Sequence, residues 1–510
     1  TISVKMNIKK NLFLTLFITI STALVNFSLN KYFVLSLGVD SLGLIRLISQ
    51  LTVYLALLDL GLSTSATVSF YKPLLYGDKK KISSIFHTVS RFYNRVAVCI
   101  SIIGILALPV LGYLVEYKDN SFYIYWLIFV IVQSLNFKLM KYTILFLADQ
   151  KFGFVKLVTG FGLLIEKIIQ LVSIIYFESL LLFVMLSFFS VFVKWFYFSR
   201  FFVFNYKLSP DLKVYDNDVS SDAKKMIFHK LAYIAVYNTD VLLIAKFLSL
   251  SIVGIYSSYL MIVSMVMTIV SVFHQVLDPV IGRIVAQGKQ GHAFSLWEHL
   301  FRFSFFLSTI ICSLLYIFVY PFVILWLGED FLLPQAILIL ILLNLAFDIL
   351  KWPIELFKYK YAYYNDIYVP VLEVLINLIV SIVLIQKYGL LGVVLGTVIS
   401  NVLIALLLRP FLVFMKCFNK NAFSYLKELL INVMFTLFSL FLVNHLVSTL
   451  KIMEYVSISG WVNLVFYALV VFSIIFVVVM VVFLLRKENR TSFLELYKFI
   501  FNKDILRIEK

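Results

Sequence analysis

Apolar runs follow one another along almost the whole chain of 510 residues, and this pattern constrains the fold more than any other feature. A helix that crosses the hydrocarbon core of a bilayer needs about 20 predominantly apolar residues. The sequence therefore predicts an all-α polytopic membrane protein with about fourteen transmembrane helices. We expect the spans at residues 11–30, 44–70, 88–115, 121–147, 154–176, 179–202, 229–248, 253–276, 300–327, 332–355, 366–386, 390–415, 427–449 and 461–485.

The composition supports a membrane location. Hydrophobic residues make up 62% of the chain and charged residues only 14%, with a mean hydropathy of +1.00. Soluble domains are roughly half apolar and about a quarter charged. A net charge of +17 often indicates a nucleic-acid partner. Here the basic residues lie in short segments between apolar runs, so we expect no nucleic-acid binding.

Lysine and arginine also predict the orientation, because they are enriched in cytoplasmic loops. If the N-terminus is cytoplasmic, most of the 44 Lys and Arg residues fall in cytoplasmic segments, and Lys31, Lys118, Lys387 and Lys451 fall in outside loops. We therefore expect an even number of spans and both termini in the cytoplasm. The first apolar run, 13–29, is long for a signal peptide and lacks a small-residue cleavage site, so we interpret it as the first span.

A polar segment at about 203–228, containing LSPDLKVYDNDVSSDAKK, divides the chain into halves. The two halves show a weak internal sequence similarity. The segment LGVDSLGLIR at 37–46 is similar to LSLSIVGIY at 248–256, with Gly43 and Gly254 at matching positions. Many transporters are built from internal repeats. The alternative is that a glycine turn between two helices simply recurs.

Ionisable residues within the predicted spans indicate a bundle interior or an aqueous cavity, because a charge at mid-bilayer costs a few kcal/mol. These residues are Asp59, Arg91, Arg95, Glu166, Lys167, Asp240, Asp348 and Glu373. Structural roles are the alternative. The two arginines, which share one helix face, could snorkel to the cytoplasmic surface. The carboxylates and Lys167 could join neighbouring helices.

Motifs of enzymatic chemistry are absent from the sequence. It contains no GxxxxGK[ST] phosphate-binding loop and no HExxH. Cys99, Cys312 and Cys417 lie in or beside apolar runs, without a CxxC pair or a Cys/His cluster. The predicted outside loops are too short to bind a large acceptor. We expect no enzyme, no catalytic residue, no metal site and no cofactor.

Three segments resemble a known family. Residues 37–82 contain DLGL and then GDKKKI, residues 238–262 contain VGIY, and residues 387–401 form a glycine-spaced turn, KYGLLGVVLGTVISN. In order, spacing and predicted sidedness these segments resemble the polysaccharide flippases (Wzx type) of the multidrug/oligosaccharidyl-lipid/polysaccharide exporter superfamily. The resemblance covers the layout of nearly the whole chain.

The resemblance implies two pseudo-symmetric six-helix bundles in a V shape like that of MATE transporters, with two additional C-terminal helices. In this sequence the implied parts are a first bundle, a cytoplasmic linker, a second bundle, the additional helices and a cytoplasmic tail, at 1–205, 206–228, 229–418, 419–485 and 486–510. The implied location is the bacterial cytoplasmic membrane.

The implied substrate is an undecaprenyl-pyrophosphate-linked oligosaccharide that moves to the outer leaflet for surface polysaccharide synthesis. Besides membrane lipids, a polysaccharide polymerase and its chain-length machinery are the expected partners. The pyrophosphate needs cations, and the planar guanidinium of arginine suits phosphate. We expect Arg91 and Arg95, together with Lys167 or Arg46, to bind it.

A buried carboxylate that changes its protonation state could couple transport to a gradient of H+ or Na+. Asp59, Glu166 and Asp240 are the candidates. Three other functions stay open. A multidrug antiporter would favour an acidic, aromatic cavity, a lipid II-type flippase would share the layout of fourteen spans, and an assembly scaffold would not need charges within the membrane.

Overall fold

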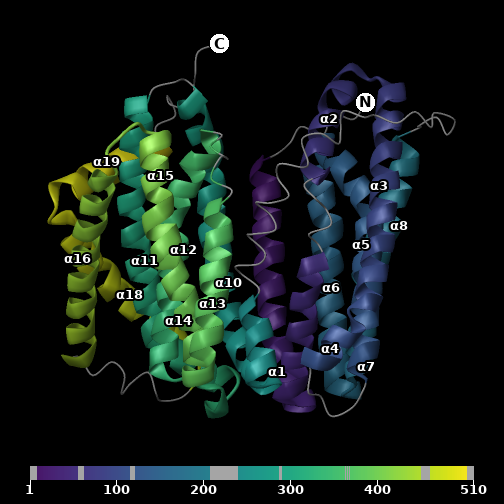
Figure 1. The fold of residues 1–510 in the computed structure, drawn as a ribbon, viewed down its shortest axis with the longest axis horizontal. Coiled ribbons are helices and arrows are strands. Elements are labelled where there is room, and N and C mark those ends of the chain that lie inside the picture. The colour runs from purple at the N-terminus through teal and green to yellow at the C-terminus, as the bar shows by residue number, and fades with distance from the viewer. Residues whose placement is uncertain are drawn as a thin grey trace. The chain divides into compact units, whose positions relative to one another are not determined.

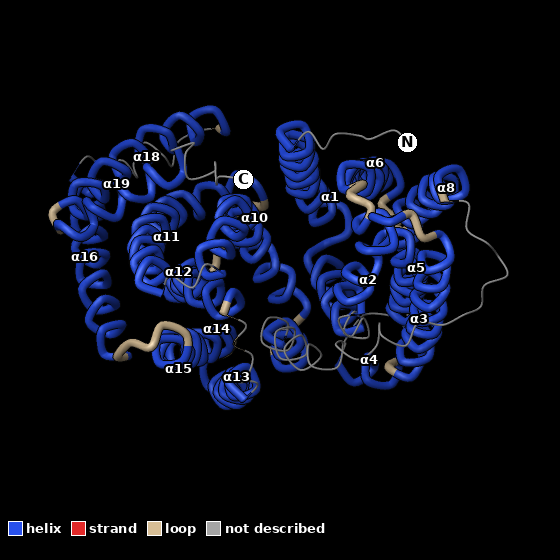
Figure 2. The backbone as a smooth tube through the Cα atoms, turned by 90° about the horizontal axis from the view of Figure 1, so that it is seen from above, coloured by secondary structure: helices blue, strands red, loops and turns tan. Residues whose placement is uncertain are grey.

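The computed structural model describes residues 8–55, 62–114, 121–206, 239–286, 290–361, 363, 366, 368–449 and 460–501. Within these ranges the regular structure is helical and contains no strand (Figure 1, Figure 2). Most of the helices are long and apolar. The predicted all-α polytopic membrane fold is confirmed.

The chain separates into two compact units, Thr1–Ser258 and Tyr259–Lys510. Apart from Tyr206, the predicted linker at 206–228 lies outside the described residues. The predicted domain limits therefore stay predictions, and each unit is described by itself.

The described part of the first unit is made of helices. They are α1 (Ile8–Leu55), α2 (Leu62–Tyr76), α3 (Lys79–Leu106), α4 (Leu108–Leu114), α5 (Phe122–Ala148), α6 (Phe152–Phe177), α7 (Leu180–Met185), α8 (Phe188–Asn205), a helix at 239–247 and the start of α10 (Leu250–Ala286). Within the unit, α1 packs against α6, and α3 packs against α5. Asp78 caps α3, because its Oδ1 accepts a hydrogen bond from the Lys81 N–H at 3.0 Å.

Helix α1 contains a sharp break at Gly38, where φ is +80°. A side chain would be strained in this conformation, which glycine adopts without cost. The segment after the break approaches the start of α10 closely. A Cβ atom on Gly43 would lie 1.8 Å from the Leu250 carbonyl oxygen, and one on Gly254 would lie 2.8 Å from the Val39 carbonyl oxygen. Only glycine fits at these two positions without a shift of the backbone.

The second unit contains the rest of α10 and the helices that follow it. They are α11 (Gln290–Trp326), the short 3-10 helix η3 (Glu329–Phe331), α12 (Gln335–Lys360), α13 (Tyr368–Tyr388), α14 (Leu390–Ser400), η4 (Asn401–Leu408), α15 (Arg409–Lys416), α16 (Ala422–Thr449), α18 (Trp461–Leu484) and α19 (Lys487–Phe501). Helix α11 is central, with contacts to α12, α16, α18 and α19 (Figure 2). Helices α13 and α14 form a tight antiparallel pair (Figure 1).

The segment η4 is π-helical, and it interrupts the α-helix that α14 begins and α15 ends. At its end the Arg409 N–H donates a hydrogen bond to the Ile404 carbonyl, five residues earlier. Such segments insert one residue into an α-helix and are frequent at functional sites.

Twelve helices among the described residues are long and apolar enough to cross a membrane by length and composition. The difference from the fourteen predicted spans has two sources. The predicted spans 11–30 and 44–70 begin on either side of the break at Gly38, in the two helical segments that α1 joins. Only residues 239–248 of the predicted span 229–248 belong to the described part of the chain.

Candidate functional site

In the first unit, a polar cluster forms around Glu166, Lys167 and Gln170 of α6. Lys167 Nζ lies 3.6 Å from Glu166 Oε1 and donates a hydrogen bond to Gln170 Oε1 at 2.8 Å. The Gln170 amide group donates to the Phe183 carbonyl oxygen of α7 at 3.0 Å. Glu166 and Gln170 are buried. The neighbours Glu166 and Lys167 therefore pair with each other inside the unit.

Glu166 also holds the start of α8. Its Oε2 accepts a hydrogen bond from the Ser190 N–H at 3.3 Å. Ser190 belongs to the first turn of α8, where backbone N–H groups have no partner within the helix. A carboxylate is favourable there, because the helix N-terminus carries partial positive charge.

Arg46 joins the same region from α1. Its Nη2 donates to Asn30 Oδ1 at 2.8 Å, across the break at Gly38. Arg46 also lies near enough to Lys167 for the two positive charges to interact. Two of the four cations predicted to bind pyrophosphate are thus near enough to interact, and one of them, Lys167, pairs with Glu166.

Arg91 and Arg95 lie elsewhere in the unit, on α3. The buried face of this helix includes Val89 and Tyr93, whereas both arginines are on its exposed face. The predicted pyrophosphate-binding set is therefore divided between a part-buried cluster and an exposed helix face.

Asp240 is buried in the helix at 239–247, with 9% of its surface exposed. Its Oδ2 accepts a hydrogen bond from the Tyr256 hydroxyl at 3.4 Å. Its charge also acts on Tyr54 of α1. Asp59, the third predicted coupling carboxylate, lies outside the described residues. The coupling roles of Asp59, Glu166 and Asp240 stay predictions.

The second unit contains a charged stripe that includes Asp348, one of the ionisable residues predicted to lie within the spans. Along α12 it comprises Asn344, Asp348, Lys351, Glu355 and Lys358. Spacings of four and three residues place these side chains on one helix face. This periodicity was the available signal. The predicted span 332–355 includes Asp348 and Lys351, whereas Lys358 lies beyond its end.

Each member of the stripe has a partner, and three of the partners lie on other segments. Asn344 Oδ1 accepts a hydrogen bond from Asn401 at 3.0 Å, and Lys358 Nζ lies 2.6 Å from Asp366. Asp348 pairs with Lys351 on α12 itself.

Arg409 is bound by two carboxylates at the end of this stripe. Its Nη1 pairs with Glu355 of α12, and its Nη2 lies 2.7 Å from Glu373 Oε2 of α13. Arg409 and Glu373 are both buried. This ion triad joins three helices, which indicates a structural role.

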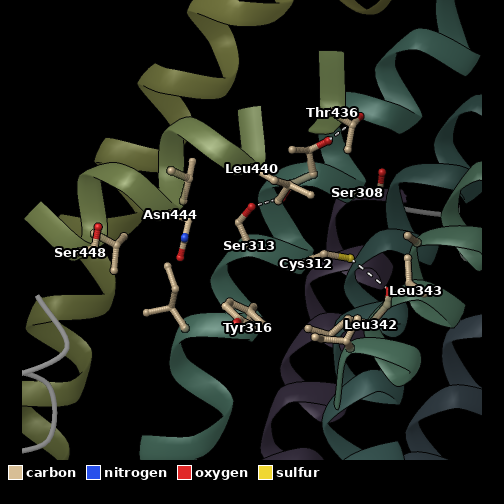
Figure 3. Close-up of a pocket in the computed structure, with 16 residues that line it drawn as sticks. Ser308, Cys312, Ser313, Tyr316, Leu342, Leu343, Thr436, Leu440, Asn444 and Ser448 are labelled. Carbon is tan, nitrogen blue, oxygen red and sulfur yellow. Dashed lines mark hydrogen bonds between the residues drawn. The ribbon is translucent and has the colours of Figure 1, made fainter. Parts of the chain in front are cut away.

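A partly open cavity of about 510 Å³ lies between α11, α12 and α16 (Figure 3). We refer to it as the α11–α16 groove. Its walls are Ser308, Thr309, Cys312, Ser313, Tyr316 and Ile317 of α11, Ile339, Leu342, Leu343 and Ala346 of α12, and Thr436, Leu440, Val443, Asn444, Val447 and Ser448 of α16.

Hydroxyl groups in the groove are largely satisfied within the helices. Ser313 donates to the Thr309 carbonyl oxygen at 2.7 Å, and Thr309 donates to the Phe305 carbonyl oxygen at 2.7 Å. Such bonds to the preceding turn leave little polarity for a ligand. The groove therefore suits a hydrocarbon chain better than a sugar.

Comparison of the sequence with protein-family models and with curated proteins finds no match. Solved structures do share the fold. The inward closed conformation of the lipid II flippase MurJ superposes with a TM-score of 0.64 and 15% identity, covering 91% of this chain and 97% of that chain.

Multidrug transporters of the MATE family are similar as well. The inward-facing conformation of a MATE transporter of the MOP superfamily has a TM-score of 0.60 and 11% identity, covering 77% of this chain and 95% of that chain. MATE in the bent conformation gives a TM-score of 0.54 and 12% identity over 78% of this chain and 93% of that chain. The chain thus has the fold of MurJ and MATE transporters.

Proposed function

We propose that this protein is a flippase that moves an undecaprenyl-pyrophosphate-linked oligosaccharide from the cytoplasmic to the outer leaflet of the bacterial cytoplasmic membrane. The observation that carries the proposal is the α11–α16 groove, an apolar cavity of about 510 Å³ with wall hydroxyls bonded to their own helices. Such a groove suits the lipid tail of an amphiphilic substrate.

The charged head group needs a second kind of site. Arg46 and Lys167 supply two cations whose charges interact, and Lys167 pairs with a carboxylate, Glu166. A pyrophosphate that takes over the interaction with Lys167 would form charge-assisted hydrogen bonds, which are the strong class of hydrogen bond. Arg91 and Arg95, exposed on α3, are the second pair of proposed cationic ligands.

Energy coupling is assigned to the carboxylates of the same unit. Asp240 is buried beside two tyrosines, and the proton affinity of such a group responds strongly to its surroundings. We propose that Asp240, with Glu166 and Asp59, links flipping to a gradient of H+ or Na+.

The test is complementation of a bacterium that lacks its own sugar flippase and is supplied with the matching glycan pathway. Surface polysaccharide should return, and Arg46→Ala/Lys167→Ala should reduce it by about tenfold or more, as expected for lost charged hydrogen bonds. Lys156→Ala is the matched control, since Lys156 is an exposed lysine of the same helix as Lys167. Full activity of the double variant would exclude this head-group site.

A lipid II-type flippase is the second candidate, favoured by the fold shared with MurJ over 97% of that chain. Rescue of a strain depleted of its lipid II flippase, without return of surface polysaccharide, would favour this function. If neither strain is rescued and the cells gain resistance to cationic dyes, the protein is instead a multidrug antiporter.

A further inference from the structure

Two arginines from separate segments share one buried carboxylate in the second unit. Arg302 Nε of α11 donates to Glu428 Oε1 of α16 at 2.5 Å. Arg486, which follows α18, binds the same carboxylate in a bidentate manner, with Nη1 to Oε1 at 3.0 Å and Nη2 to Oε2 at 2.8 Å. Arg302, Glu428 and Arg486 are named the Glu428 cluster here. It joins segments that are far apart in the sequence.

The cluster also fixes the C-terminal helix α19 to α11. Arg302 Nη1 donates to Ser492 Oγ at 3.1 Å and to the Glu488 carbonyl oxygen at 3.4 Å. His299 Nδ1 lies 2.9 Å from Ser492 Oγ. Asn489 and Ser492 are each only 1% exposed, so the first turns of α19 are packed against the bundle.

Arg486, which directly precedes α19, connects this helix to α16 by binding Glu428. Burial alone would lower the pKa of its guanidinium, but Glu428 and Glu488 outweigh this effect and raise the pKa. The side chains of Arg486 and Glu428 are each 11% exposed. Loss of Arg486 would remove the two charge-assisted hydrogen bonds by which the segment before α19 holds Glu428, and would leave Arg302 as the remaining arginine partner of this carboxylate.

The cluster lies in line with the α11–α16 groove on the same two helices. From Arg302, α11 continues to Thr309, and from Glu428, α16 continues to Thr436. The hydroxyl oxygens of these threonines are 3.2 Å apart and belong to the groove wall. With a rise of about 1.5 Å per residue, the groove begins about 10 Å from the ion pairs. The cluster therefore fastens the two walls at one end of the groove.

We infer that the Glu428 cluster is a clamp, closed by α19, that sets the spacing of the groove walls α11 and α16. Its residues are positioning residues that do not touch the ligand. The relevance of this spacing to a lipid tail rests on the proposed function. The link between the Glu428 cluster and the spacing of the groove walls does not depend on that function. Release of the clamp should loosen the groove along its length.

The native thiol of Cys312 reports on the groove, because it lines the wall and donates a hydrogen bond to the Leu342 carbonyl oxygen at 3.4 Å (Figure 3). In a Cys99→Ser/Cys417→Ala background, N-ethylmaleimide labels this thiol alone. Arg486→Ala should accelerate its labelling about tenfold, the effect of losing charge-assisted hydrogen bonds on local opening. Arg486→Lys keeps the charge without the bidentate geometry and should give a smaller acceleration.

Arg490→Ala is the matched control. Arg490 is an exposed arginine of α19 that bonds to the Leu484 carbonyl oxygen, and its loss should leave the labelling rate unchanged. Unchanged rates in both Arg486 variants would overturn the clamp, as would an equal acceleration in Arg490→Ala.

A second measurement covers the case in which Arg486→Ala lowers the amount of protein in the membrane. Thr309→Cys/Thr436→Cys should form a disulfide in the parent chain, and Arg486→Lys should lower the yield. An equal yield would contradict the clamp. Neither readout depends on transport. Altered labelling together with absent flipping would therefore support the clamp and contradict the proposed function.

Discussion

Ser251 at the start of α10 donates a hydrogen bond to Asp40 of α1, which lies 211 residues earlier in the chain. The contacts around this bond are reciprocal: Gly43 packs against Leu250, and Gly254 packs against Val39. In each segment the glycine lies four positions after the residue that the other segment's glycine contacts: Gly43 follows Val39, and Gly254 follows Leu250. Reciprocal contact of this kind is the mark of a local two-fold relationship. The similar segments at 37–46 and 248–256 thus meet face to face.

Gly43→Ala is expected to destabilise the protein. The added Cβ would lie 1.8 Å from the Leu250 carbonyl oxygen, a backbone atom that cannot move by itself. Overpacking of this kind typically costs about 1–3 kcal/mol. Thermal unfolding in detergent should show a lower midpoint. Gly291→Ala, where no atom lies within 4 Å of the new Cβ, is the control and should not lower it.

Arg409→Met is expected to cost about 3–5 kcal/mol, because it leaves the buried Glu373 and the partly buried Glu355 without their partner. Glu355 and Glu373 both bind this arginine. Glu355→Gln/Glu373→Gln in the Arg409→Met chain should restore most of the loss, as measured by denaturant unfolding. Lys416→Met, at an exposed position of the same helix, should have little effect. If the triple variant is no more stable than Arg409→Met, the ion triad is not the cause.

Glu166→Ala should lower the free energy of unfolding by about 1 kcal/mol, the usual cost of losing a helix cap. The Ser190 N–H loses its acceptor in this variant. Glu166→Gln keeps an acceptor oxygen and should retain most of the stability. Equal losses in both variants would indicate that the charge of Glu166, through Lys167, matters more than the cap.

Ala346→Trp should block flipping without unfolding the protein. Ala346 lines the α11–α16 groove, and an indole ring there would occupy space proposed for the lipid tail. Ile379→Trp on α13 is the control, since Ile379 is 59% exposed and lies outside the groove. Surface polysaccharide in the complementation strain is the readout. Wild-type levels with Ala346→Trp would show that the groove is not used.

The helices themselves were predictable from the sequence, because the bilayer imposes both their length and their apolarity. Residues 121–147 were predicted and α5 spans Phe122–Ala148, and 461–485 were predicted where α18 spans Trp461–Leu484. Helix ends outside the apolar runs were less predictable. Helix α3 begins at Lys79 rather than 88, because a polar helix can continue beyond the hydrocarbon once Asp78 caps it.

The partners of the charged side chains could not be predicted from spacing. Arg302 and Arg409 lie near the ends of the predicted spans 300–327 and 390–415, yet both are buried and paired with carboxylates from other helices. Their pairing depends on how distant segments pack, which a periodic pattern does not encode. Pairs within one helix could be predicted from the sequence: Asp348 and Lys351 share a helix face and do form an ion pair.

The π-helical segment η4 makes the ion triad depend on chain length. One residue more or less rotates the rest of a helix by about 100°. Arg409 directly follows η4, so its direction toward Glu355 and Glu373 is set by the number of residues in the preceding turns. A deletion of one apolar residue between 401 and 408 would remove no charge, yet it would change the rotation of α15 relative to α14 and with it the direction of the guanidinium. Among homologues, a gap in this segment should therefore coincide with loss of the arginine.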